Sequence, residues 1–197
     1  MQITNDTIAG KKVIFESIVD EITGGLSIPV ATLDYLTHNV NVDKRYLPAG
    51  TPVYVDYAAR TATVAKSTIA LTGSTAQAIR VPKNNHFKVD DILNDGTTGA
   101  TITGITTSVT TYDTLAVDAA LIYAVGTKYF EGSATGTNAT LKVTPNGLTK
   151  DQVYLADGNA DGAVVTIGTV REAALTYPIP AVYATALRGT KSLITLQ

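Results

Sequence analysis

The most specific chemical pattern in the chain is the acidic, glycine-containing segment at residues 157–162. Its oxygen-bearing side chains, Asp157, Asn159 and Asp161, stand at alternate positions before a glycine, as in the first half of a calcium-binding loop. The bidentate glutamate of such a loop belongs six residues after that glycine, where this chain has Gly168. Two interpretations therefore stay open. The simpler one is an Asx turn between strands, and the other is a small structural cation site.

His86, Asp90 and Asp91 form a second group of possible metal ligands. The other histidine, His38, is far away in the sequence, and a catalytic metal normally needs three protein ligands. We therefore favour a structural or solvent-exposed role for His86 and predict no metal centre. On a strand, the adjacent carboxylates Asp90 and Asp91 would point to opposite faces, which is a poor arrangement for a general acid–base pair.

Nucleophilic chemistry has few candidates in this sequence. The chain has no cysteine, and no serine stands in a nucleophile-elbow sequence. The glycine-rich segment 96–99 lacks the Lys-Ser/Thr ending of a phosphate-binding loop. The sequence therefore predicts a protein without enzymatic activity and without a cofactor. A hydrolase of cell-wall sugars is a third-ranked hypothesis, because the two carboxylates that it requires have no sequence signature.

Composition limits the classes of partner. Of the 197 residues, 16% are charged, which is below the roughly 25% of an average globular domain. The formal net charge is −2, and the basic residues are scattered and form no patch that could displace counterions from nucleic acid. The N-terminal residues do not resemble a signal peptide, and no apolar run has the length of a membrane span. We therefore expect a soluble protein, made in the cytoplasm, that binds neither nucleic acid nor membranes.

The elements that must position these side chains are predicted to be mostly strands. Threonine, valine, alanine and glycine are abundant, and short apolar runs recur between turn signals, which indicates an all-β sandwich or a barrel-like domain. Residues 53–57 and 61–65 have the spacing of a hairpin, and residues 121–130 continue the strand pattern. We interpret Pro145-Asn146-Gly147 as a turn between strands.

Three regions are predicted along the chain. Residues 1–45 form an extended N-terminal arm with one or two strands, residues 46–135 a central β domain, and residues 136–197 a C-terminal β region. Residues 132–137 are predicted to be a flexible hinge between the last two. One short helix is expected near the C-terminus, where Pro180 stands near its start and Gly189 at its end. Its apolar face consists of Ile179, Val182, Ala186 and Leu187.

Several segments between about residue 25 and residue 180 resemble the head decoration and head-fibre proteins of tailed bacteriophages, especially those of phages of gut Bacteroidetes. The matching segments are 47–56, 78–83, 87–92, 112–115, 141–148 and 170–172. The resemblance implies an auxiliary capsid protein of the virion surface, commonly oligomeric, that docks on the assembled major capsid protein. It implies no catalytic activity and no cofactor.

Two functional hypotheses follow. In the first, the protein binds the outer surface of the capsid shell and decorates or stabilises it as a cyclic homotrimer, since symmetric closure suits repeated sites on a shell. Ile14, Phe15 and Ile18 of the N-terminal arm are the predicted contacts with the capsid. In the alternative hypothesis, the protein is a head-fibre base or adhesin whose aromatic side chains present a glycan-binding surface.

Overall fold

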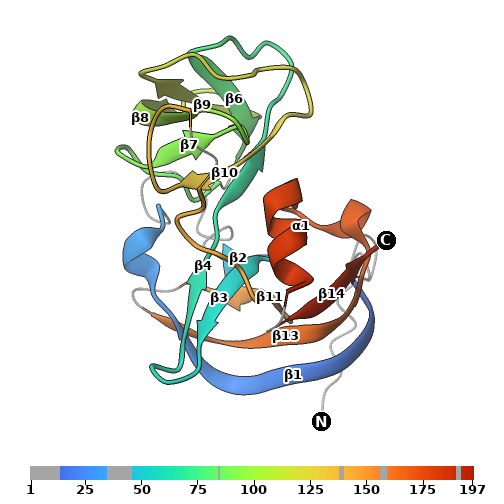
Figure 1. Cartoon of the computed structure of the whole chain (residues 1–197). Coiled ribbons are helices and arrows are strands. Elements are labelled where there is room, and N and C mark those ends of the chain that lie inside the picture. The colour runs from blue at the N-terminus through green and yellow to red at the C-terminus, as the bar shows by residue number, and fades with distance from the viewer. Residues whose placement is uncertain (1–13, 35–45, 84, 138–139, 156–158, 190–191) are drawn as a thin grey trace.

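A computed structural model describes residues 14–34, 46–83, 85–137, 140–155, 159–189 and 192–197. The predicted fold class is confirmed, because this part of the chain is mostly β and contains one short C-terminal helix, α1 (Ala181–Leu187). The strands form two lobes, one above the other in Figure 1. We call them the barrel lobe and the insert lobe.

The barrel lobe is a small closed sheet. In order of pairing, its strands are β1 (Phe15–Ile28), β4 (Thr61–Val64), β3 (Pro52–Asp56), β11 (Gly147–Thr149), β13 (Ala160–Val170) and β14 (Leu193–Leu196). Because β13 also pairs antiparallel with β1, the sheet closes on itself. Strand β14 extends it as a parallel neighbour of β13, and β2 (Tyr46–Leu47) pairs with β12 (Val153–Tyr154) beside it.

The insert lobe lies between β4 and β11 in the sequence. In order of pairing, its strands are β5 (Ser67–Ile69), β10 (Lys128–Gly132), β7 (Ile92–Asn94), β8 (Gly99–Thr106), β9 (Tyr112–Val117) and β6 (Ala78–Pro82). The backbone N–H of Leu71, just after β5, donates to the carbonyl of Arg80 in β6 at 2.8 Å. This bond brings the two outer strands together, so the insert lobe is also barrel-like.

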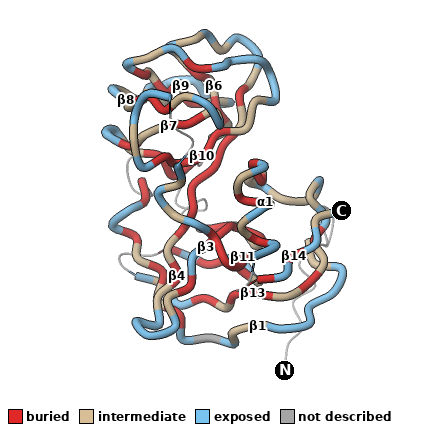
Figure 2. The backbone as a smooth tube through the Cα atoms, viewed as in Figure 1, coloured by how far each residue is buried: buried red, intermediate tan, exposed pale blue. Residues whose placement is uncertain are grey.

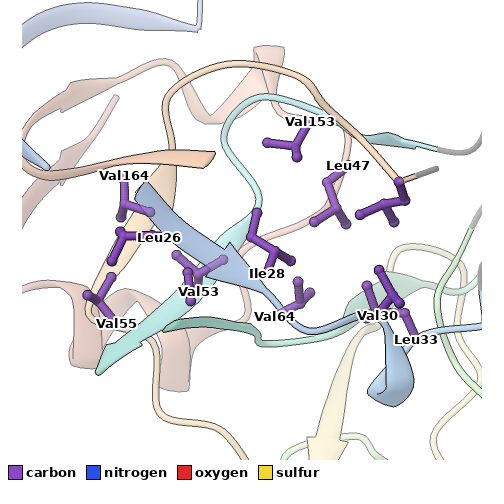
Figure 3. Close-up of a cluster of buried hydrophobic side chains, with 12 residues drawn as sticks. Leu26, Ile28, Val30, Leu33, Leu47, Val53, Val55, Val64, Val153 and Val164 are labelled. Atoms are coloured by element: carbon purple, nitrogen blue, oxygen red, sulfur yellow. The ribbon is translucent and has the colours of Figure 1, made fainter. Parts of the chain in front are cut away.

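Alternating burial explains why these segments form strands. Along β9 every second residue is buried, which places Asp113, Leu115 and Val117 on the inner face. One apolar cluster fills the barrel lobe, including Leu26, Ile28 and Val53 (Figure 3), and a second fills the insert lobe. The two lobes therefore have separate cores.

A third apolar cluster joins the lobes through α1. Pro180 stands at the N-cap of the helix, and Tyr183 and Leu187 are fully buried. The ring of Tyr183 packs against Phe130 of β10, with 6.0 Å between the ring centroids. The linker from β4 to β5 is residues 65–66. It is buried together with the strand residues on either side, 64 and 67–68, and Figure 2 shows this stretch as a continuous buried connection between the lobes. The helix thus fixes the base of the insert lobe to the barrel lobe.

Several predictions for individual segments have a clear outcome. The hairpin at residues 53–65 and the C-terminal helix are confirmed. The predicted strand at residues 121–130 begins only at Lys128, because residues 121–127 form a loop whose backbone bonds lead to neighbouring turns. The predicted hinge at residues 132–137 is held by backbone bonds between Gly136 and Gly99, so flexibility there is not supported.

The division of the chain into three consecutive regions stays a prediction. In the described residues, strand pairing forms two lobes whose members do not follow those three regions. Strands β3 and β4 belong to the predicted central domain together with the insert lobe, but β4 pairs with β1 and β3 pairs with β11 in the barrel lobe. The described part of the predicted N-terminal arm is extended, as expected. It forms β1, which pairs along the length of β13 and so makes one wall of the barrel lobe.

Candidate functional site

The first candidate site is an exposed apolar loop, residues 121–126, which we call the display loop. It connects β9 to β10 and crosses the outer end of the insert lobe in Figure 1. Ile122 and Tyr123 are each 50% exposed and Val125 is 67% exposed. Water-exposed apolar side chains that lie next to each other in a loop are typical of a contact surface.

The backbone of the display loop is held in place from both sides. Ile122 N–H donates to the Asp95 carboxylate at 2.8 Å, and the Tyr129 hydroxyl donates to the Ile122 carbonyl. Gly126 N–H donates to the Ala70 carbonyl at 3.0 Å. A loop whose backbone is held in this way would lose little conformational entropy in a contact made through it.

Asp95 is the charged residue beside the display loop. Burial acts to raise the pKa of its carboxyl, but hydrogen bonds from Ile122, Thr98 and Thr97 outweigh that effect and hold the pKa below its ordinary value. The carboxylate oxygens of Asp95 therefore already accept hydrogen bonds from within the protein. A shallow hollow of about 510 Å³ lies here, lined by Asp95, Thr97, Thr98 and residues 120–124. The exposed side chains of the display loop are therefore mainly apolar.

The second candidate is a group of four charged side chains where the insert lobe meets the barrel lobe, which we call the ion cluster. It consists of Lys66 in the linker, Asp91 in the turn before β7, Glu131 in β10 and Lys142. The Lys66 ammonium lies 2.5 Å from Asp91 Oδ2 and 3.3 Å from Glu131 Oε1. Lys142 Nζ lies 2.5 Å from Glu131 Oε1 and 3.7 Å from Asp91 Oδ1.

Burial distinguishes the members of the ion cluster. The side chains of Lys66, Glu131 and Asp91 are 1%, 2% and 10% exposed, whereas that of Lys142 is 49% exposed. The Phe87 ring lies 5.9 Å from Lys66 Nζ and adds an apolar wall. Burial raises the pKa of Glu131, the Lys66 charge lowers it, and the Asp91 charge raises it again, with a net rise. Fully desolvated charges of this kind are costly, so their presence requires close pairing.

His86 lies next to the ion cluster and is fully buried. Its ring packs edge-on against Tyr177, and neither ring nitrogen has a hydrogen-bond partner among the described residues. Burial, helped by the Lys66 charge and opposed by Asp34, lowers the pKa of His86 to about 4. A cavity of about 10 Å³, the size of one water, is lined by Val64, Ala65, Lys66, Ser67, His86 and Tyr177. A structural role for His86 is thus favoured, as predicted.

The residues of the possible cation site do not converge in the described structure. Asp157 lies outside the described residues. Asn159 Oδ1 accepts a hydrogen bond from the Val30 N–H at 3.3 Å, and Asp161 is an exposed residue of β13, paired with Ser27. Residues 160–162 are therefore strand and not turn. Within the described ranges, no group of three or more acidic, histidine or cysteine side chains is placed to hold a metal ion.

The other predicted residues are separated as well. Asp90 has a positive φ of 74° and is exposed, whereas the neighbouring Asp91 is buried in the ion cluster. His38 lies outside the described residues. Ile14 and Phe15 are half-buried against the apolar cluster around α1, while Ile18 is 39% exposed.

Sequence reasoning missed the display loop and three members of the ion cluster, Lys66, Glu131 and Lys142. Gly126, which has a φ of 90°, was a signal that the run from residue 121 contains a turn. Lys66 and Glu131 had no such signal, because they are 65 residues apart in the sequence.

The sequence matches no protein-family model, no curated protein and no solved structure. Among the described residues, no helix is long and apolar enough to cross a membrane.

Proposed function

We propose that the chain is a structural protein of a virus particle, which binds the outer surface of the major capsid protein shell and decorates or stabilises it. The observation that carries this proposal is the ordered display loop, with Ile122, Tyr123 and Val125 exposed at the outer end of the insert lobe. The similarity of several segments to phage head proteins supports the same partner.

The chemistry of the display loop fits a protein surface better than a small charged ligand. The three exposed side chains offer apolar contact, and the adjacent carboxylate of Asp95 is already occupied by internal hydrogen bonds. A contact of this size is weak by itself, but the binding strength of many identical contacts on one shell increases through multivalency. Binding that favours the intact shell over its loosened form stabilises the shell.

The predicted contact by Ile14, Phe15 and Ile18 remains a second proposal. Ile18 and the next residue, Val19, which is 74% exposed, present apolar side chains from β1. Ile14 and Phe15 contribute instead to the packing around α1. A contact through β1 would therefore rest on Ile18 and Val19.

Cosedimentation with shells of the major capsid protein from the same virus tests the proposal. We expect the double variant Tyr123→Ser, Val125→Ser to bind at least about tenfold more weakly, which corresponds to about 1.4 kcal/mol. The control is Tyr57→Ser, in the turn of the β3–β4 hairpin, because Tyr57 is 56% exposed and lies in the other lobe. Equal binding by the double variant and the control would refute docking through the display loop. Ile18→Ser, measured in parallel, tests the β1 contact.

Virion composition and assembly state are tested separately. Quantitative mass spectrometry of purified virions should find this protein at a copy number within a few-fold of the major capsid protein. Complete absence from virions would overturn the whole proposal. The proposed homotrimer is checked by sedimentation, and a strict monomer both free and on shells would contradict it.

One observation favours the alternative of a glycan-binding head-fibre base or adhesin. Tyr123 lines the shallow hollow beside Thr97 and Asp95, and an aromatic ring at such a hollow is a common platform for a sugar. A glycan array with the wild-type protein and with Tyr123→Ser separates the two functions. Glycan signals that disappear in the variant, together with unchanged binding to shells, would favour the adhesin.

A further inference from the structure

The ion cluster places an amine against a carboxyl group inside the protein. Lys66 Nζ lies 2.5 Å from Asp91 Oδ2, and both side chains are buried. Holding two reacting groups together in this way replaces an encounter in solution with an intramolecular step, which removes much of the entropic barrier. A desolvated lysine is also a recognised nucleophile in proteins.

The positions of both reacting groups are fixed by the backbone. The carbonyl of Lys66 accepts hydrogen bonds from the Tyr183 hydroxyl at 2.8 Å and from the Glu131 N–H at 3.1 Å. The Asp91 carbonyl accepts a bond from the Ile102 N–H at 2.9 Å. The amine and the carboxyl therefore approach each other from two rigid segments.

The neighbouring groups are those that an acyl transfer needs. Glu131 Oε1 lies 3.3 Å from Lys66 Nζ, within reach for proton transfer. The net rise in the pKa of Glu131, which burial causes, suits a carboxyl that accepts and then returns a proton. The backbone N–H of Lys88 donates to Asp91 Oδ2 at 2.7 Å, where it can stabilise negative charge that develops on this oxygen.

We propose that Lys66 and Asp91 condense to form an intramolecular isopeptide bond, with Glu131 as the general acid–base. Glu131 takes a proton from the ammonium and delivers it to Oδ1 of Asp91, and the free amine then attacks Cγ of the neutral carboxyl. Negative charge develops on Oδ2, which the Lys88 N–H stabilises. Glu131 takes a second proton from the nitrogen and passes it to the Oδ1 hydroxyl, which leaves as water. The ammonium and the carboxylate thus become one amide and one water, with no net oxidation or reduction.

The change in buried charge favours the product. Before condensation, the cluster holds two ammonium groups and two carboxylates, and Lys66 and Asp91 form its most closely spaced buried pair. Condensation converts that pair to a neutral amide. The remaining pair of Glu131 and Lys142 is also neutral overall, and Lys142 is half-exposed. The reaction therefore removes two charges whose desolvation is costly.

The bond would tie the linker between the lobes to the turn before β7. It closes a loop between positions that are 25 residues apart and fixes the base of the insert lobe covalently. The inference does not depend on the proposed function, because it rests on the buried ion cluster and not on the display loop.

Mass spectrometry of the intact, denatured full-length protein tests the proposal. We expect a mass lower than the calculated one by one water. Tryptic digestion should give a branched peptide that joins residues 61–80, uncleaved at Lys66, to residues 89–128, with fragmentation placing the branch on Asp91 and not on Asp90. The full calculated mass, with cleavage after Lys66, would overturn the proposal. A loss of water without the branched peptide, as from a succinimide, would overturn it too.

Two variants test the role assigned to Glu131. Glu131→Gln keeps the shape of the side chain but cannot exchange a proton, so we expect its full calculated mass. Lys128→Met is the matched control, because Lys128 pairs with Glu172 outside the ion cluster, and it should keep the loss of water. A branched peptide in Glu131→Gln at wild-type yield would contradict the assigned role. If this variant fails to fold, the mass and the peptides of the wild-type protein still decide whether the bond forms.

Discussion

Asn146 provides a quantitative test of how the barrel lobe is held together. Strand β11 pairs with β3 at Gly147 and Leu148, and the chain turns away before it reaches Val55. At that point the side chain of Asn146 makes the hydrogen bonds to β3 that the backbone of β11 no longer makes. Its Oδ1 accepts from the Val55 N–H at 2.7 Å, and its Nδ2 donates to the Val55 carbonyl at 3.1 Å. The side chain therefore acts as an additional residue of the missing strand.

The substitution Asn146→Ala removes both bonds. Val55 is 1% exposed and Asn146 is 6% exposed, so water does not readily replace the amide. A buried backbone group left without a partner costs about 1 to 3 kcal/mol, so the two groups together cost about 2 to 6 kcal/mol. For a chain of this size, that corresponds to a decrease in Tm of about 10 °C.

Urea denaturation followed by circular dichroism and by tyrosine fluorescence measures this loss. Coincidence of the two signals checks that the lobes unfold together, which the free-energy calculation requires. Thr144→Ala is the control, because Thr144 is exposed nearby, and it should stay within about 0.5 kcal/mol of the wild-type protein. A loss below about 1 kcal/mol in Asn146→Ala would show that Val55 has other partners and would refute the reasoning.

Two further predictions concern His86 and Gly147. The folded-state pKa of His86, about 4, lies below the ordinary 6.5, so the unfolded chain binds more protons between these values. Stability should therefore fall by up to about 3 kcal/mol as the pH drops through that window. Urea midpoints at several pH values should show that His86→Gln lacks this part of the pH dependence, and an unchanged slope would contradict it. A Cβ at Gly147 would lie 2.5 Å from Val164 Cγ1 and 3.0 Å from the Val165 carbonyl oxygen, so Gly147→Ala should cost about 1 to 3 kcal/mol in thermal or urea unfolding. Gly104→Ala, where a Cβ has open space, should be close to neutral, and equal effects of the two substitutions would argue against steric crowding at Gly147 as the cause.

The local elements were predictable because their signals are local. The hairpin around residues 53–65 follows from alternating β-branched residues on both sides of a short turn. The helix follows from Pro180 at its start and an apolar face of helical spacing. The irregular register in β8, between Ile102 and Gly104, accompanies a change in the phase of the apolar residues.

Other local signals were ambiguous because only burial resolves them. Pro145-Asn146-Gly147 has the composition of a turn, yet Gly147 begins β11 and a close approach to Val164 excludes a side chain there. The apolar residues from Leu121 onward fit a strand by pattern, but Ile122, Tyr123 and Val125 face solvent. A periodic pattern does not reveal whether a partner strand lies beside it.

By itself, the sequence determined the β-rich class, the principal hairpin and the C-terminal helix, since each depends on the conformational preferences of neighbouring residues. The tertiary structure alone decided which strands pair, because β1 and β13 lie more than 130 residues apart and their pairing depends on which surfaces fit. It also brought Lys66, Asp91 and Glu131 together inside the protein. Charged residues usually face water, so nothing in their types or spacing indicated this site, and only the closure of the insert lobe created it.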